Sequence, residues 1–153
     1  MRATSAFGDD FADAFDGRLE YQSPKFLLFY NTSYDAFPHI GNHHPKVTFS
    51  VAHELGHYFL ERHRRFLKKG GRAHCSLAEF LSDNQPEREA DTFAASLLMP
   101  AYLASSIVNK NELTLSRLDD IARTFEISLL CTAIRAVQLR SILVRLLASV
   151  MAG

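Results

Sequence analysis

The chain has 153 residues, with 17 Lys plus Arg against 17 Asp plus Glu, so its formal net charge is zero. That length is typical of one domain, and a content of 47% hydrophobic and 22% charged residues is typical of a globular protein that buries a core. The composition excludes a disordered chain and argues against a broad basic surface for nucleic acid. It stands out in one respect, because seven His accompany no Trp.

Several features predict a soluble cytoplasmic protein that does not bind a membrane. No segment reaches the roughly 18–20 apolar residues that span a bilayer, and the acidic N-terminal segment lacks the apolar core of a signal peptide. The two cysteines, Cys75 and Cys131, are not in C-x-x-C spacing. We therefore expect two buried free thiols in a reducing compartment.

The first predicted elements are two strands and a long helix. Arg18–Tyr21 and Phe26–Asn31 are rich in aromatic and apolar residues on either side of Ser23-Pro24, which predicts a β-hairpin. A loop is expected over Asn31–Pro45. A long helix is predicted over Lys46–Phe66, because this segment contains one Gly and no Pro.

The rest of the chain is predicted to be helical after a second loop. The loop is expected over most of Lys68–Gln85, and Pro86 is well placed as the first residue of a helix that ends near Met99. Two more helices are predicted over Thr114–Phe125 and Ser128–Ser149.

Strands followed by helices predict an α+β fold with a small antiparallel sheet. We expect residues 1–153 to form a single domain. Its main part covers residues 15–110, and a C-terminal helical subregion covers residues 111–153.

The long predicted helix contains the pattern H-E-x-x-H, formed by His53, Glu54 and His57. On a helix, the two histidines lie one turn apart on one face and can bind one metal ion. Glu54 is offset by about 100°, which suits a general base that acts on water at the metal. The histidine side is expected to face a cleft. The opposite, buried side is expected to hold Val47, Val51, Leu55, Tyr58 and Phe59.

A catalytic zinc site needs a third protein ligand, and His63 is one candidate. It follows His57 by six residues, as the third histidine of a metzincin does, but the position of the metzincin glycine holds Leu60. If the helix continues through Leu60, His63 lies about 9 Å along the axis from His57 and cannot share the ion. We therefore expect His63 to be a solvated helix residue.

Glu87, on the next predicted helix, is the better candidate for the third ligand. It lies about 50° from the centre of an apolar helix face, and a carboxylate aimed at a core needs a partner such as a cation. Glu89 points away from that face and remains the alternative. Asp91 lies one turn after Glu87 and is expected to accept a hydrogen bond from a ligand histidine. The apolar face is formed by Ala90, Phe93, Ala94, Leu97 and Leu98.

These residues predict a zinc hydrolase with one Zn²⁺ per chain. Zinc lowers the pKa of water that it holds toward about 7, and Glu54 takes the proton before attack on a peptide carbonyl. The loop over residues 39–44 is a weaker candidate for a second metal site. The developing oxyanion or the substrate needs further contacts. The sequence does not choose among His74, Tyr30, Tyr102, His43 and His44.

Three runs of sequence resemble the ImmA/IrrE family of metallopeptidases: VTFSVAHELGHYFLERH, PEREADTFAASLLMP and LDDIARTFEISLLCTAIRAVQLR. The resemblance covers roughly residues 15–140 and includes the strand pair FDGRLEYQSPKFLLFYNTS. It implies a zincin-like fold with Glu54 as the catalytic acid/base. It also implies zinc ligation by His53, His57 and Glu87, with Asp91 where the family has Asp or Asn.

Two features depart from the family pattern. Members often have a helix and a strand before the hairpin, whereas only Met1–Phe15 precedes it here, which implies a smaller sheet or a truncated chain. The loop His39–Pro45, with GNHHP, is the second departure.

By analogy with the family, we expect a bacterial zinc endopeptidase that cleaves a helix-turn-helix repressor or an antitoxin and so controls stress or mobile-element genes. The alternative is a non-cleaving, metal-bound module that docks a repressor or toxin; Glu54 favours the enzyme, because a structural metal site does not need it. Arg135 and Arg140 lie among apolar residues, so no direct contact with nucleic acid is expected. The apolar tail Ser141–Gly153 is a candidate homodimer contact.

Overall fold

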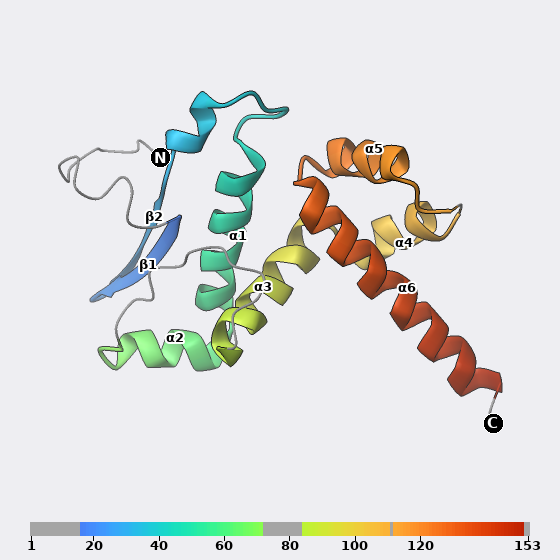
Figure 1. Ribbon diagram of the computed structural model, residues 1–153. Helices are drawn as coiled ribbons and strands as arrows, with labels where there is room; N and C mark the ends of the chain where they lie inside the picture. The colour runs from blue at the N-terminus through green and yellow to red at the C-terminus, as the bar shows by residue number, and fades with distance from the viewer. Residues whose placement is uncertain (1–15, 72–83, 111, 152–153) are drawn as a thin grey trace.

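The computed structural model describes residues 16–71, 84–110 and 112–151, with side chains described as far as Arg140. It is an α+β structure, as predicted, in which a small antiparallel sheet packs beside a larger set of helices (Figure 1). The elements in chain order are β1 (Gly17–Gln22), β2 (Lys25–Tyr30), a 3-10 helix η2 (Ser33–Ala36), α1 (Pro45–Phe59), α2 (Glu61–Lys68), α3 (Gln85–Leu98), α4 (Ala101–Asn109), α5 (Leu115–Phe125) and α6 (Leu129–Met151).

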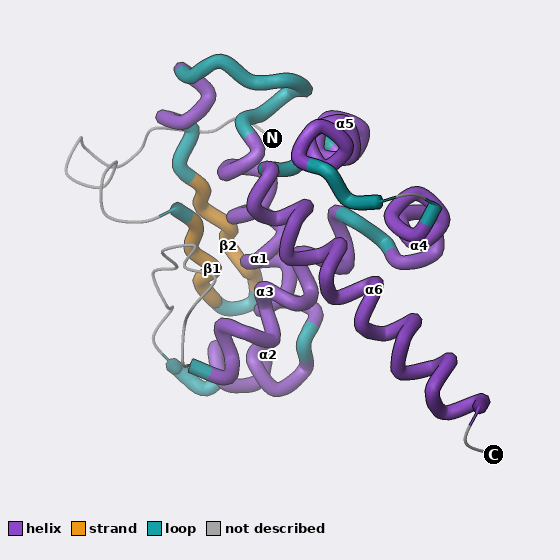
Figure 2. Tube along the Cα trace, turned by 45° about the vertical axis from the view of Figure 1, so that its right-hand side comes forward, coloured by secondary structure: helices purple, strands orange, loops and turns teal. Residues whose placement is uncertain are grey.

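The predicted hairpin is present. Strands β1 and β2 pair antiparallel, with Gly17 opposite Tyr30 and Gln22 opposite Lys25. Helix α1 contacts both strands and also packs against α3, so it lies between the sheet and α3 (Figures 1 and 2).

The single helix predicted over Lys46–Phe66 is wrong, because the chain turns at Leu60 and forms two helices. Leu60 has φ −71° and ψ 113°, an extended conformation open to any residue, so the turn needs no glycine. Helix α2 then runs in a new direction (Figure 1) and buries His63 and Leu67, which lie one turn apart. Leu60 is a good helix former, so its identity does not predict a turn. Burial of the His63 and Leu67 side chains stabilises the turn instead.

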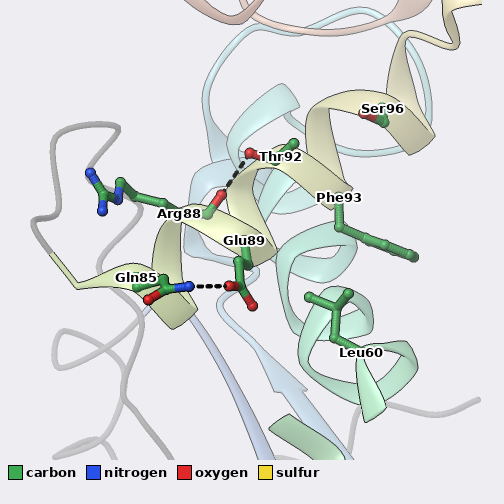
Figure 3. A pocket seen from close by; sticks show the side chains of 7 residues that line it. All are labelled: Leu60, Gln85, Arg88, Glu89, Thr92, Phe93 and Ser96. Atoms are coloured by element: carbon green, nitrogen blue, oxygen red, sulfur yellow. Dashed lines mark hydrogen bonds between the residues drawn. The ribbon is translucent and has the colours of Figure 1, made fainter. Parts of the chain in front are cut away.

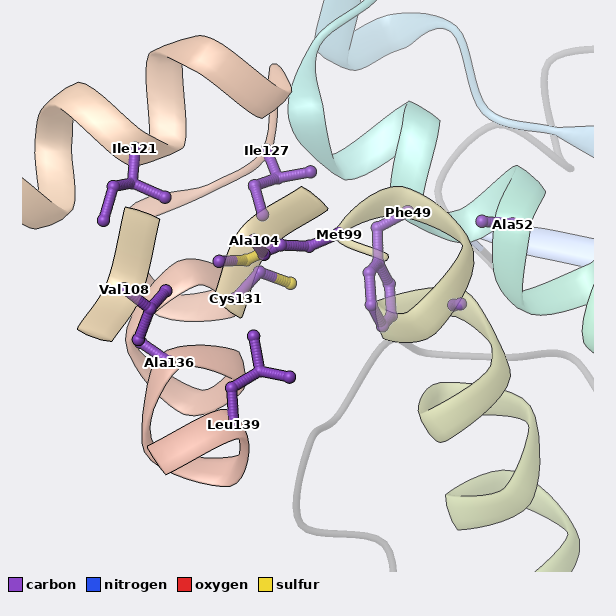
Figure 4. Close-up of a cluster of buried hydrophobic side chains, with 11 residues drawn as sticks. Phe49, Ala52, Met99, Ala104, Val108, Ile121, Ile127, Cys131, Ala136 and Leu139 are labelled. Atoms are coloured by element: carbon purple, nitrogen blue, oxygen red, sulfur yellow. The ribbon is translucent and has the colours of Figure 1, made fainter. Parts of the chain in front are cut away.

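The hydrophobic core lies between the α1–α3 pair and the C-terminal helices (Figure 4). Pro100 ends α3, as predicted, but it is also the N-cap of α4, a helix that the sequence analysis did not identify. The buried core side chains are Phe49, Ala52, Ala94, Met99, Ala104, Val108, Ile121, Ile127, Cys131, Ala136 and Leu139.

Two arginines of α6 bind the chain's own backbone at helix ends. Arg135 donates from Nε to the carbonyl of Met99 at 3.2 Å, and Arg140 donates from Nη2 to the carbonyl of Val108 at 3.1 Å. Carbonyls in the last turn of a helix have no partner within the helix. These arginines therefore hold α6 against the ends of α3 and α4.

The cysteines and the two ends of the chain are only partly covered by the described residues. Cys131 is a buried free thiol, whereas Cys75 lies outside the described residues, as does Met1–Phe15. The proposed dimer contact over Ser141–Gly153 also lies outside the described side chains. Among the described residues, no single helix is long and apolar enough to span a membrane; α3 and α4 pass this test only as a pair bent by 74°.

Helices α1 and α3 approach each other closely at Gly56 and Ala90. A Cβ atom added to Gly56 would lie 3.1 Å from Ala90 Cα, 3.2 Å from Ala90 O and 3.3 Å from Phe93 Cβ. Ala90 itself is fully buried. The glycine of H-E-L-G-H therefore favours close packing of the two helices, whereas its neighbours in the motif are the candidate metal-site residues.

We expect Gly56→Ala to destabilise the protein. Overpacking costs about 1–3 kcal/mol, whereas alanine gains about 1 kcal/mol over glycine in a helix. The atoms that the methyl group would meet are the backbone of Ala90 and the Cβ of Phe93, which cannot rotate away, so we expect overpacking to outweigh the gain and the free energy of unfolding to fall by up to about 2 kcal/mol. Urea denaturation measures the change, with the exposed substitution Ser106→Ala as a control expected within about 0.5 kcal/mol of wild type. An unchanged or higher midpoint for Gly56→Ala would contradict the close approach of the two helices.

Candidate metal centre

The histidine side of α1 is buried, which the sequence analysis did not expect. His53 is 2% exposed, Glu54 1% and His57 6%. On the side predicted to be buried, Val47 is 1% exposed, as expected, whereas Phe59 is 59% exposed. Polar side chains can be buried when partners satisfy them. Helix α3 supplies those partners, because it places carboxylates against the imidazoles of α1.

Three side chains from α1 and α3 converge on one point. The ligand atoms of His53, His57 and Glu87 all lie within 4.8 Å of one another. The two Nε2 atoms are 3.1 Å apart, and Glu87 Oε2 lies 3.1 Å from His53 Nε2. Two imidazole nitrogens and a carboxylate oxygen form one of the donor sets of catalytic zinc sites. The arrangement brings together the three residues that the sequence analysis selected.

One atom of this cluster has a lone pair that the described chain leaves unused. Glu87 Oε1 is buried and accepts no hydrogen bond from the described residues, although His57 Nε2 lies 3.5 Å away. A buried carboxylate oxygen without a partner is unfavourable. A metal cation between the three donor groups would satisfy it, so the residues present fit a metal ion.

Asp91, one turn along α3 from Glu87, contacts the other side of the His53 ring. Its Oδ1 lies 2.8 Å from His53 Nδ1. A proton on Nδ1 leaves Nε2 free as a lone-pair donor toward the cluster. The structure thus places Asp91 where it can fix the tautomer and the orientation of His53.

The charges of the cluster reinforce one another. Burial alone would lower the pKa of His53, but hydrogen bonds to Asp91 and Glu87 and the charge of Glu54 raise it to about 9. Burial alone would raise the pKa of Glu87, but the adjacent His53 and His57 hold it well below its usual range. The carboxylates that retain a proton on His53 would equally attract a metal cation.

Glu54 lies between the cluster and the start of β1. A Cβ atom added to Gly17 would lie 2.9 Å from Glu54 Cγ and 3.1 Å from its Oε1, so only glycine at this position leaves room for the carboxylate. No local sequence pattern predicts this contact, because Gly17 precedes Glu54 by more than thirty residues. The sheet therefore takes part in placing the glutamate of the motif.

The prediction that His63 is solvated is wrong. His63 is 8% exposed, and its Nδ1 lies 3.1 Å from Nδ1 of His57. The turn at Leu60 shortens the distance that a continuous helix would impose. His63 therefore contacts the nitrogen of His57 that points away from the cluster.

The opposite nitrogen of His63 lies 3.0 Å from Oε2 of Glu89, the residue considered as an alternative ligand. Burial lowers the pKa of His63 despite this contact. Glu89 also borders an open pocket of about 590 Å³ between α3 and the Leu60 turn (Figure 3). The pocket is lined by Leu60, Gln85, Arg88, Glu89, Thr92, Phe93 and Ser96.

Three of the candidates for oxyanion or substrate contact are placed differently from one another. His74 lies outside the described residues. Tyr102 is 81% exposed on α4. The ring of Tyr30, at the end of β2, lies 6.2 Å from that of His43. None of these positions assigns a contact to the reacting groups.

The histidines of the loop before α1 have local partners. His43 Nδ1 lies 2.8 Å from Asp35 Oδ2, while His44 accepts a hydrogen bond from the backbone N–H of Lys46 at the start of α1. Within the described ranges, residues 39–44 form no group of three ligands close enough to hold a metal ion. The loop instead fixes the beginning of the motif helix.

The comparison with protein families agrees with the resemblance seen in the sequence. The model of the Peptidase_M78 family, described as the IrrE N-terminal-like domain, matches residues 41–136. Comparison with curated proteins finds no match. The matched segment spans α1, α3 and most of the C-terminal helices, and so includes the whole cluster. Because it covers more than half of the sequence, the chain belongs to the Peptidase_M78 family.

Proposed function

We propose that this peptidase-family chain is a zinc-dependent endopeptidase. The observation that carries the proposal is the convergence of His53, His57 and Glu87, with their ligand atoms within 4.8 Å, beside the buried Glu54. A structural metal site needs ligands such as His53, His57 and Glu87 but does not need Glu54. A carboxylate kept beside the donor set favours hydrolysis.

The three donor groups would hold one zinc ion, which supplies Lewis acidity toward a peptide carbonyl and toward water. His53 and His57 contribute Nε2, and Glu87 contributes its carboxylate. Asp91 keeps His53 in the tautomer that this role requires.

Glu54 would act as the general base and then as the general acid. It takes a proton from the attacking water and delivers it to the leaving amine, so the same carboxylate serves both halves of the reaction. Gly17 of β1 leaves the space that the side chain of Glu54 occupies, which supports a defined position for this carboxylate. General acid–base catalysis by one positioned group contributes about 10²–10⁴-fold to a rate.

The proposed substrate is a bacterial helix-turn-helix repressor or an antitoxin. Support for it comes from the family resemblance, since membership in a peptidase family implies a protein substrate. Cleavage of such a regulator would release the genes that it represses. The competing function is binding of the regulator without cleavage.

We expect the wild-type chain to bind about one Zn²⁺ and Glu87→Ala to lose it, because two imidazoles alone form an incomplete site. Inductively coupled plasma mass spectrometry of purified protein measures the stoichiometry. Glu61→Gln is the matched control, since Glu61 is an exposed carboxylate that pairs with Arg65 on α2. Full occupancy in Glu87→Ala would move the third ligand elsewhere.

We expect Glu54→Gln to keep its zinc and to lose cleavage by about 10²–10⁴-fold, because the amide cannot accept the proton. The assay is co-expression with a candidate helix-turn-helix repressor from the source genome, followed by mass spectrometry of that partner. The partner should be shortened by wild type alone. If both chains bind the partner and neither shortens it, the docking function replaces the peptidase.

Gly17→Ala tests the contact between β1 and Glu54. The added methyl group would displace the carboxylate, so kcat should fall while zinc content stays at the wild-type level. Leu27→Ala, on β2, is a control for general weakening of the hairpin. Equal loss of activity in both variants would show that the Gly17 contact has no specific role.

A further inference from the structure

The buried His63 has no part in the proposed reaction, yet it is held between two groups of the site. Its Nδ1 lies 3.1 Å from His57 Nδ1, and its Nε2 lies 3.0 Å from Glu89 Oε2. The rings of His57 and His63 are 5.0 Å apart between centroids. In a neutral histidine with both nitrogens hydrogen-bonded, one nitrogen donates and the other accepts, so its two partners decide the tautomer.

The proposed ligation decides the tautomers of His57 and His63. His57 Nε2 faces His53 Nε2 and Glu87, so for metal binding it must be the unprotonated nitrogen of the ring. The proton of neutral His57 then resides on Nδ1, which donates to Nδ1 of His63. His63 in turn carries its proton on Nε2 and donates to Glu89. Each N–H in the hydrogen-bonded series His57–His63–Glu89 then meets an acceptor.

The chain of hydrogen bonds ends at the surface. Glu89 Oε1 accepts a hydrogen bond from Gln85 Nε2 at 2.8 Å, at the edge of the open pocket (Figure 3). The Glu89 side chain is 36% exposed, whereas that of His63 is 7% exposed. The acceptor at the far end is therefore an ionised carboxylate in contact with solvent, which polarises the two rings in one direction.

The two metal-binding imidazoles are thus supported in different ways. His53 contacts a carboxylate directly, through Asp91 at 2.8 Å. His57 reaches a carboxylate only through an intervening ring, that of His63. Outer partners of this kind orient metal-binding histidines and raise their basicity, and their loss commonly costs about 10–100-fold in metal affinity.

We propose that His63 and Glu89 are positioning residues that orient His57 and select its Nε2 for the metal ion. The proposal rests on the proposed function, since it assumes that His57 binds the metal. The turn at Leu60 is needed for this role, because only the change of direction into α2 brings His63 to His57. It also separates the roles of three carboxylates on α3, namely Glu87 toward the ion and Asp91 and Glu89 toward the two imidazoles.

The test measures zinc dissociation constants, by competition with a chelator, in the full-length chain. We expect His63→Leu to raise the dissociation constant by about 10–100-fold and Glu89→Gln to raise it by a smaller factor. His63→Gln should restore most of the affinity, because its amide can accept from His57 and donate toward Glu89. Glu61→Gln, a carboxylate of α2 outside the network, should bind as wild type does.

Cobalt substitution adds a readout that loss of packing alone would not give. The visible absorption of bound Co²⁺ should change in His63→Leu and return toward the wild-type spectrum in His63→Gln. In the zinc-loaded wild type, long-range ¹H–¹⁵N spectra should show the proton of His63 on Nε2. Should His63→Leu fail to fold, Glu89→Gln and the tautomer of His63 still decide, because the Glu89 side chain is partly exposed.

Several results would overturn the proposal that His63 and Glu89 orient His57. Wild-type affinity in both His63→Leu and Glu89→Gln would do so, as would a proton of His63 on Nδ1. Equal weakening in His63→Gln and His63→Leu would indicate packing rather than hydrogen bonding. If the wild type binds no metal, the proposed function and the positioning role of His63 and Glu89 fail together. If the wild type binds zinc and both variants have the same dissociation constant, the positioning role alone fails.

Discussion

Helices α1 and α3 meet so closely at Gly56 and Ala90 that even the methyl group of an alanine at position 56 would be in tight contact with α3. That contact brings the carboxylates of one helix within hydrogen-bond distance of the imidazoles of the other. Buried imidazoles and carboxylates are unfavourable alone and become acceptable as partners. The polar face of α1 can therefore point into the protein. Helix packing and site formation are in this molecule a single constraint, and a change that separates the helices removes both.

The remaining elements hold that pair of helices in place. The hairpin covers the opposite side of α1 and leaves at Gly17 the space that Glu54 occupies. The C-terminal helices close the core against α3, with Arg135 bound to the backbone at its end. Helix α2 returns from Leu60 and places His63 behind His57. Each imidazole of the cluster consequently has one nitrogen toward the proposed metal and one toward a fixed partner.

The features that the sequence predicts correctly are the local ones. The hairpin, the motif helix and the helix that carries Glu87 follow from patterns within about twenty residues, and the fold class follows from their order. The turn at Leu60 has no local signal, because leucine favours a helix and the turn depends on burial of His63 in the tertiary structure. The burial of the histidine face was missed for the same reason. A polar face is expected in solvent until its partners, 34 and 38 residues away, are known.

The central claim is that α1 and α3 together hold one zinc ion through two imidazoles and one carboxylate. A crystal structure of the zinc-loaded chain, with anomalous scattering at the zinc edge, tests it most directly. We predict one peak at about 2.0–2.2 Å from His53 Nε2, His57 Nε2 and a Glu87 oxygen, with His63 outside the coordination shell. A peak bound by His63, or one at any other group of residues, would contradict the account.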